Sequence, residues 1–342
     1  TEHDSLGAIE VPRSALWGSD AIGGVVNMVD GRTAETPVGG FGGRAELHGD
    51  TVNNERAGMV RLDAGNGAAA MHVDYVRRDG DDFDLPDGSL LNSAIDQKSG
   101  AAGAGYASDA GFLGVSFSRY DSLYGIPLGP SNAEPEAGEE AEEIRLDQEQ
   151  TRVDVRGGIY SPWTWLDKLS FRFADNDYEH VELADGEIGT RFTNDAWEGR
   201  IEAVHAGFGG WTGAFGYQAS SRDFAALGAE AFVPPTTTDD WGLFLIERRE
   251  FEPFELELGA RYDSVESETD TGLSSDHSPV SLSAAGLWRF SEAWHASLNL
   301  DRAQRAPVAE ELYSDGPHEA TGSFEIGAAD LDQATANQVE IG

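Results

Sequence analysis

Residues 254–265 read FELELGARYDSV, and their pattern is the clearest structural signal in the chain. Apolar residues occupy every second position, and most of the positions between them are charged. The apolar set is Phe254, Leu256, Leu258, Ala260 and Tyr262, and the charged set is Glu255, Glu257 and Arg261. Because successive side chains of a β-strand point to opposite faces, the stretch predicts a strand with one apolar and one charged face.

Similar alternation recurs along the chain and predicts fourteen strands. We expect them at 41–50, 54–65, 68–79, 99–107, 111–121, 148–160, 167–179, 194–206, 209–221, 239–250, 253–265, 279–290, 293–303 and 336–342. Most are long enough to cross the hydrocarbon layer of a membrane at a tilt. The pattern therefore predicts an all-β fold, an antiparallel transmembrane β-barrel.

The connections between the predicted strands alternate between very short turns and long, polar, acidic loops. A membrane barrel has short turns on its periplasmic side and long loops outside. If the first strand runs outward, the periplasmic turns lie near Asn66, Asp109, Pro162, Gly209, Glu252 and Glu292. The outer loops are then 80–98, 122–147, 180–193, 222–238, 266–278 and 304–335, with one tight outer turn at Asn53 and Asn54. This regular alternation of short turns and long loops supports the number of predicted strands, because one missed strand would invert it.

A soluble β-sandwich also contains alternating strands, and the aromatic residues favour the barrel over it. Seven tryptophans lie near the ends of predicted strands, where the interfacial girdle of a membrane barrel places amphipathic rings. They are Trp163, Trp165, Trp197, Trp211, Trp241, Trp288 and Trp294. We therefore expect two aromatic borders on the lipid-facing surface.

The composition excludes several classes of protein. A formal net charge of -39 argues against nucleic-acid binding, which needs clustered Lys and Arg. The absence of Cys excludes disulfides and thiolate metal sites. A mean hydropathy of -0.40 is compatible with a barrel, which exposes only alternate side chains to lipid. No stretch approaches the roughly 20 apolar residues of a membrane helix.

The segment 15–27 reads ALWGSDAIGGVVN, a turn-rich stretch with paired glycines between two apolar runs. It resembles the end of the plug domain of TonB-dependent outer-membrane receptors. The residues that carry the motif are Gly18, Ser19, Ala21, Gly23, Gly24 and Asn27. The resemblance implies the end of a plug at 1–34 and a barrel at 35–342, with about 14 of about 22 strands present. We therefore expect a fragment whose remaining plug and strands lie beyond its two ends.

Three further segments resemble the zinc-receptor branch of this family. They are SRYDSLYGIPLGP (118–130), GEIGTRFTND (186–195) and RAPVAEELYSDGPHEATGSFEIG (305–327). Members of that branch import zinc, and sometimes haem, so the resemblance implies zinc as the transported ligand and no required cofactor. The loop 131–144, SNAEPEAGEEAEEI, departs from the branch because it carries carboxylates without His, and carboxylates favour hard cations.

Candidate metal ligands lie in the predicted outer loops, where imidazole and carboxylate groups together suit zinc. One cluster is His318 with Glu310, Glu311, Asp315 and Glu319; a second is His180 beside Glu179 and Glu182; a third is Glu139, Glu140, Glu142 and Glu143. Two or three of these loops folding over the plug could supply a tetrahedral site. Each cluster alone is also typical of a solvated surface. For His48, His72, His205 and His295, which fall within predicted strands, we expect hydrogen bonds to neighbours rather than ligation.

The resemblance predicts an active importer in the outer membrane of a Gram-negative bacterium. Its energy would come from a TonB-type complex, because the chain has no phosphate-binding loop. The other expected partners are outer-membrane lipid and lipopolysaccharide, and a metal ion or metal chelate. Haem, a siderophore or another organic ligand is the alternative within this class. A barrel enzyme or a passive pore is the alternative outside it, but no GxSxG elbow is present, and plug-like residues argue against an open pore.

Overall fold

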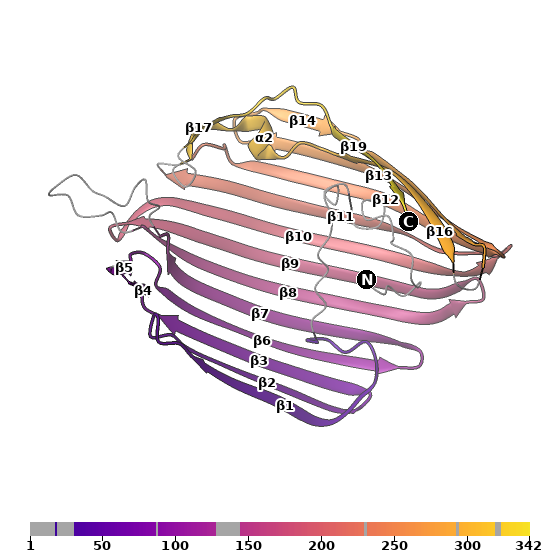
Figure 1. The fold of residues 1–342 in the computed structure, drawn as a ribbon, viewed down its shortest axis with the longest axis horizontal. Helices are drawn as coiled ribbons and strands as arrows, with labels where there is room; N and C mark the ends of the chain where they lie inside the picture. Colours follow the sequence, from indigo (N-terminus) through magenta and orange to yellow (C-terminus); the bar gives the residue numbers. More distant parts are fainter. Residues whose placement is uncertain are drawn as a thin grey trace.

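The computed structural model describes residues 18, 31–86, 88–127, 144–228, 231–291, 294–318 and 323–342. Its main feature is one antiparallel sheet, in which fourteen strands of the described chain follow one another in sequence order. The sheet curves into a single wall (Figure 1). The all-β, antiparallel fold predicted from the alternating pattern is therefore confirmed.

The strands of the wall share long, continuous antiparallel pairing. They are β1 (Val38–Gly49), β2 (Arg56–Gly67), β3 (Ala69–Gly80), β6 (Ile95–Ser108), β7 (Gly111–Gly125), β8 (Ile144–Trp163), β9 (Leu166–Ala184), β10 (Glu187–Phe208), β11 (Trp211–Gly228), β12 (Thr236–Phe251), β13 (Phe254–Thr269), β15 (Val280–Arg289), β16 (His295–Arg305) and β19 (Ala334–Ile341). The shorter elements are β4 (Phe83–Leu85), β5 (Gly88–Leu90), β14 (Ser274–His277), β17 (Asp315–His318), β18 (Ser323–Ile326) and the helix α2 (Ala309–Tyr313). All of these short elements belong to the predicted outer loops.

Each of the fourteen predicted strands is present, and several continue further outward than expected. The prediction of a long outer loop at 180–193 is wrong, because β9 and β10 extend to a two-residue turn at Asp185 and Gly186. Both turn residues have positive φ, 49° and 82°, as in the tight turns that suit twisted hairpins. Beyond the membrane both faces of a strand meet water, so apolar alternation no longer marks the strand in the sequence.

The outer face of the wall carries an apolar band between two aromatic borders. One border contains the ring pairs Phe173–Trp197, Tyr217–Trp241 and Trp241–Tyr262. The other contains Trp163–Trp165, Phe251–Phe254 and Phe254–Trp288. Aliphatic side chains between the borders, among them Val115, Ile201, Leu243 and Leu245, are exposed on this face. The distribution is that of a membrane barrel, although Trp197 and Trp241 stand in mid-strand because their strands continue beyond the border.

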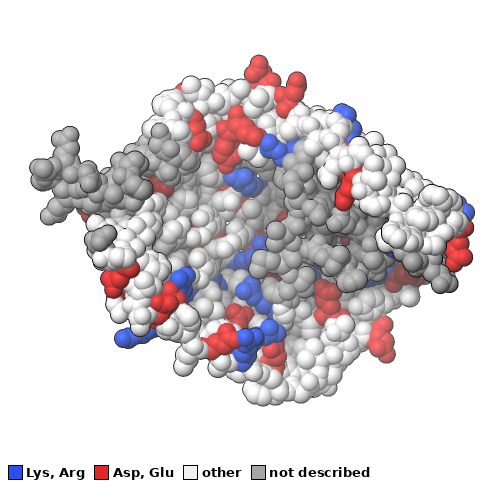
Figure 2. Space-filling view, in the orientation of Figure 1, with Lys and Arg blue, Asp and Glu red and all other residues white. Residues whose placement is uncertain are grey.

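The inner face of the wall is polar and charged. In Figure 2, Lys and Arg are visible within the hollow, and most of the visible Asp and Glu lie towards its rim. His72 is 6% exposed, and its two ring nitrogens each lie 2.7 Å from a carboxylate oxygen, one of Asp63 and one of Asp74. This network confirms the prediction that this strand histidine bonds to its neighbours.

Residues 31–37 lie along this inner face before the first strand begins. Two wall glycines make room for them. A Cβ at Gly103 would stand 1.9 Å from the carbonyl oxygen of Arg32, and a Cβ at Gly114 would stand 2.7 Å from the side-chain Cβ of Thr33. Because residues 31–37 approach the wall strands so closely, the wall has no space for a side chain at either glycine.

The short helix α2 is fastened near the outer end of the wall by a small apolar cluster. The buried members are Val233, Ala309, Leu312 and Tyr313, and Phe224 and Phe232 pack against them. Among the described residues no helix is long and apolar enough to cross a membrane.

We expect Gly103→Val to lower the thermal unfolding midpoint of the full-length receptor in detergent. The added side chain must displace residues 31–37 from the wall, and overpacking of this kind costs about 1–3 kcal/mol. Gly286→Val is the matched control, because no atom lies within 4 Å of a Cβ at Gly286. An unchanged midpoint for G103V would contradict the close approach.

Candidate functional site

Two adjoining cavities lie along the inner wall, and Glu198 and Gln218 border both of them. The larger one, of about 300 Å³, is bordered by Gly18 of the predicted plug, by Arg261 of the wall and by residues 306–309 at the start of α2. Gly18 has a φ of 115°, which favours glycine, and a Cβ there would stand 3.7 Å from the Arg261 guanidinium. A bound ligand here could contact the predicted plug, the wall and an outer loop at the same time.

Two arginines, Arg261 of the larger cavity and Arg200 of the smaller one, are held by neighbouring side chains. Arg261 is 3% exposed, and its Nε donates a hydrogen bond of 2.7 Å to Asp263. Its guanidinium lies 6.0 Å from the centre of the Phe244 ring, and that of Arg200 lies 4.1 Å from the same ring. Arg200 also forms an ion pair of 2.9 Å with Glu202. Phe244 therefore lies beside two cations and fixes their positions through cation–π contact.

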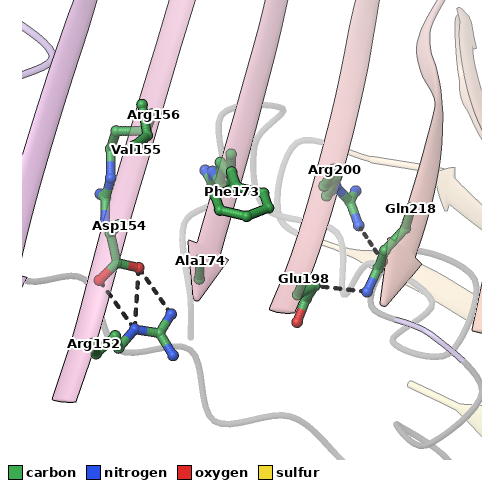
Figure 3. Close-up of a pocket in the computed structure, with 10 residues that line it drawn as sticks. Arg152, Asp154, Val155, Arg156, Phe173, Ala174, Glu198, Arg200 and Gln218 are labelled. Carbon is green, nitrogen blue, oxygen red and sulfur yellow. Dashed lines mark hydrogen bonds and ion pairs between the residues drawn. The ribbon is translucent and has the colours of Figure 1, made fainter. Parts of the chain in front are cut away.

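The smaller cavity, of about 190 Å³, lies among β8, β9, β10 and β11 (Figure 3). The Arg152 guanidinium donates three hydrogen bonds of 2.8–3.1 Å to Asp154. Gln218 donates to Glu198 at 3.0 Å and accepts from Arg200 at 3.4 Å. These bonds orient the polar side chains towards one shared space.

The smaller cavity has the opposite charge balance from the whole chain. Its lining contains the cations Arg152, Arg156, Arg172 and Arg200 and the carboxylates Asp154 and Glu198. The complete sequence has 23 Lys and Arg against 62 Asp and Glu. A cavity with more cations than carboxylates is therefore a local feature of the wall and does not follow from composition.

Glu310 and Glu311, two of the predicted metal ligands, both bond to arginines. Arg222 donates to Glu310 at 3.1 Å, and Arg305 donates to the two oxygens of Glu311 at 3.0 and 2.8 Å. Glu311 also accepts the backbone N–H of Val308 at 2.9 Å. The hydrogen bond from Arg305 lowers the pKa of Glu311. These contacts hold α2 against the wall, and metal ligation by the two carboxylates stays a prediction.

His180, which we predicted at the base of a loop, lies within β9. Its Nδ1 is 3.1 Å from the Tyr178 hydroxyl, and its ring stacks on Phe192 with a centroid distance of 4.4 Å. The strand continues past the outer aromatic border to reach it, so His180 lies outside the predicted membrane span. Burial lowers the pKa of His180 and favours the neutral ring.

The remaining predicted site residues are only partly covered by the structure. The side chain of His318 lies outside the described part, although its backbone pairs with Ser323 between β17 and β18. The backbone N–H of Asp315 donates to the Phe232 carbonyl at 2.7 Å. Outside the described residues altogether are Glu139, Glu140, Glu142, Glu143, Glu319, Ser19, Ala21, Gly23, Gly24 and Asn27. Within the described ranges, no group of three or more His, Asp or Glu is placed to hold a metal ion.

The inward arginines of the cavities are not among the site residues predicted from the sequence. They are Arg152, Arg156, Arg172, Arg200 and Arg261, and Arg222 also lines the larger cavity. Each occupies a charged position of the alternating pattern, but no motif distinguishes it from other charged positions. Only the register of neighbouring strands brings residues so far apart in the chain to one cavity.

Residues 49–342 match the family described as TonB dependent receptor-like, beta-barrel. The chain belongs to this family. Membership confirms the predicted receptor barrel, its place in the outer membrane of a Gram-negative bacterium and the prediction that it is not an enzyme. The match identifies the family as a whole and does not extend to the zinc branch.

Several solved structures share the fold of this TonB-dependent receptor barrel. They include the copper transporter OprC (15% identity, TM-score 0.69), the FrpB iron transporter from Neisseria meningitidis, F5-1 variant (15%, 0.63), and a double mutant of the Serratia marcescens hemophore receptor HasR in complex with its hemophore HasA and heme (14%, 0.69). The matches cover 90%, 78% and 89% of this chain and 51%, 46% and 50% of the others. The receptor barrel thus spans about half the length of these proteins, and at such identity the likeness shows the fold alone.

We predict that Phe192→Ala raises the pKa of His180 towards its ordinary value of about 6.5, because water reaches the imidazole once the stacked ring is removed. Titration of the His180 ring by NMR on the full-length receptor would measure this change. Phe208→Ala, on an exposed residue of the same strand, is the control and should leave the titration unchanged. Equal pKa values in F192A and the parent would contradict the role of burial.

Arg305→Gln should loosen α2, because it removes both hydrogen bonds to the Glu311 carboxylate. A partly exposed ion pair contributes up to about 1 kcal/mol, so amide hydrogen exchange at 309–313 should rise by up to about fivefold. The lowered pKa of Glu311 makes this contribution complete above about pH 4.5, and it is lost as the pH falls through the lowered value.

Arg302→Gln is the control for this experiment, because Arg302 lies on the same strand and bonds to Asn337 rather than to α2. It should leave exchange at 309–313 unchanged. Exchange in R305Q equal to that of the parent at neutral pH would show that the ion pair does not hold the helix.

Proposed function

We propose that the full-length receptor imports a scarce metal across the outer membrane, with zinc as the first candidate ligand. In this proposal residues 1–34 form the end of the plug and 35–342 form barrel wall. A TonB-type complex of the inner membrane supplies the energy. The observation that carries the proposal is the larger cavity, which is bordered together by Gly18, Arg261 and the start of α2.

The inner wall supports active import rather than free diffusion. Residues 31–37 fit against wall glycines with no space for a side chain between them. In this proposal these residues are the end of the plug, and the plug must move before a solute can pass through the lumen. The movement needs work from outside the chain, which is the role we assign to the inner-membrane partner.

The choice of a metal rests on two supports. The similar structures are named as transporters of copper and iron and as a hemophore receptor bound with heme. The segments 118–130, 186–195 and 305–327 resemble the zinc branch, and the last of them brings His318 and Asp315 to one short hairpin beside α2. Imidazole and carboxylate groups in one loop suit zinc. Haem or a siderophore complex is the alternative cargo.

Uptake of radioactive zinc by cells that carry the full-length receptor tests this proposal. We expect His318→Ala to reduce the uptake rate at limiting zinc by about tenfold, the effect of losing about 1.4 kcal/mol of binding free energy. Uptake should also require the TonB-type complex. If H318A takes up zinc as fast as the parent but loses uptake of haem or a siderophore complex, the cargo is that organic ligand and not zinc.

Glu311 needs a separate control, because its substitution also releases α2 from Arg305. Arg305→Gln breaks the same ion pair without removing a carboxylate. If Glu311 is a zinc ligand, E311Q lowers zinc uptake more than R305Q does. Equal losses in the two variants would show that Glu311 acts by holding the loop.

A further inference from the structure

Three arginines stand directly opposite one another on adjacent strands of the inner wall. Arg156 of β8 is the register partner of Arg172 of β9, and Arg172 is the register partner of Arg200 of β10. Directly opposed residues have Cβ atoms about 5 Å apart, and like charges in such positions repel. The three residues, here called the arginine row, all line the smaller cavity.

The outer two members of the arginine row have carboxylates within reach. Arg200 pairs with Glu202 at 2.9 Å, and Arg156 lies 3.7 Å from Glu35. Arg172, in the middle, forms no ion pair within the part of the chain that the structure describes, and its side chain is exposed to the cavity. The middle of the row is therefore a cation between two cations.

The carboxylates near Arg172 do not neutralise its positive charge. Asp154 accepts three hydrogen bonds from Arg152, and Glu198 accepts from Gln218 at 3.0 Å. Both are already bonded to other donors of the cavity. A guanidinium in this position offers donors in a planar fork that suits the oxygens of a carboxylate or a phosphate.

We propose that the arginine row is a binding site for a carboxylate or phosphate group, centred on Arg172. Resting on the proposed function, the inference assigns the cargo to negatively charged metal chelates, because a bare divalent cation would be repelled by three adjacent arginines. The cavity of about 190 Å³ has room for a small oxyanion group between the arginines. It adjoins the larger cavity through Glu198 and Gln218, so a chelate could extend from one into the other.

Titration of the full-length receptor in detergent with citrate and with inorganic phosphate at low ionic strength tests the site. We expect Arg172→Gln to weaken binding of these probes by about tenfold or more, since the middle fork supplies charge-assisted hydrogen bonds. Arg119→Gln, which removes an equal charge where Arg119 pairs with Asp121 and Glu149, is the control and should bind like the parent.

Thermal unfolding of the same variants separates binding from a structural role. In the absence of anion, R172Q should unfold at the same temperature as the parent or higher, because it relieves the repulsion in the row. Citrate should raise the unfolding temperature of the parent and of R119Q but not that of R172Q. A parent that binds neither probe, or an R172Q that binds them equally well, would overturn the proposal.

Uptake experiments then identify the source of the anion. Cells should take up zinc supplied with excess citrate faster than zinc chloride, and R172Q should remove this difference. If citrate binds in vitro while R172Q leaves chelate uptake unchanged, the site holds a free anion and the cargo assignment is wrong. The proposed function fails if the parent receptor transports none of the tested cargoes: zinc chloride, zinc citrate, haem or a siderophore complex. The titration still decides whether the anion site exists.

Discussion

A strand that crosses lipid must bond all its backbone N–H and C=O groups to neighbouring strands, and this requirement governs the rest of the molecule. It forces long ladders in continuous register, such as that between β12 and β13, which pairs every residue from Thr236 to Phe251. Once the ladders are fixed, each side chain is assigned to lipid or to the lumen by its position alone. The apolar band and the polar interior are two consequences of one backbone constraint.

The lumen is where this constraint leaves chemical freedom. Side chains that face the lumen neither contact lipid nor pack in an apolar core, so charged groups can gather there. Arg261 and Arg200, which both lie near the Phe244 ring, show how such groups are held, through an aromatic ring and through nearby carboxylates. Because a charged pair in a partly dry interior interacts more strongly than at the surface, these placements matter for any ligand that enters.

The outer parts of the wall are built differently from the membrane span. Strands β9 and β10 continue beyond the aromatic border as a water-exposed hairpin, and α2 is held to the wall by Glu310 and Glu311 through arginines. Candidate metal ligands in such a region also hold the loops in place.

The sequence by itself determined the strands, their pairing order and the two faces of the wall, because a period of two and the lengths of the turns are local properties. The resemblance of residues 15–27 to the end of a plug stays a prediction, and the structure places Gly18 near Arg261. The sequence predicted a loop at 180–193 where β9 and β10 continue, because alternation fades where both faces meet water. Only the tertiary structure aligned Arg156, Arg172 and Arg200 and joined Glu311 to Arg305, because these contacts depend on register between strands and on loop docking, which no local pattern encodes.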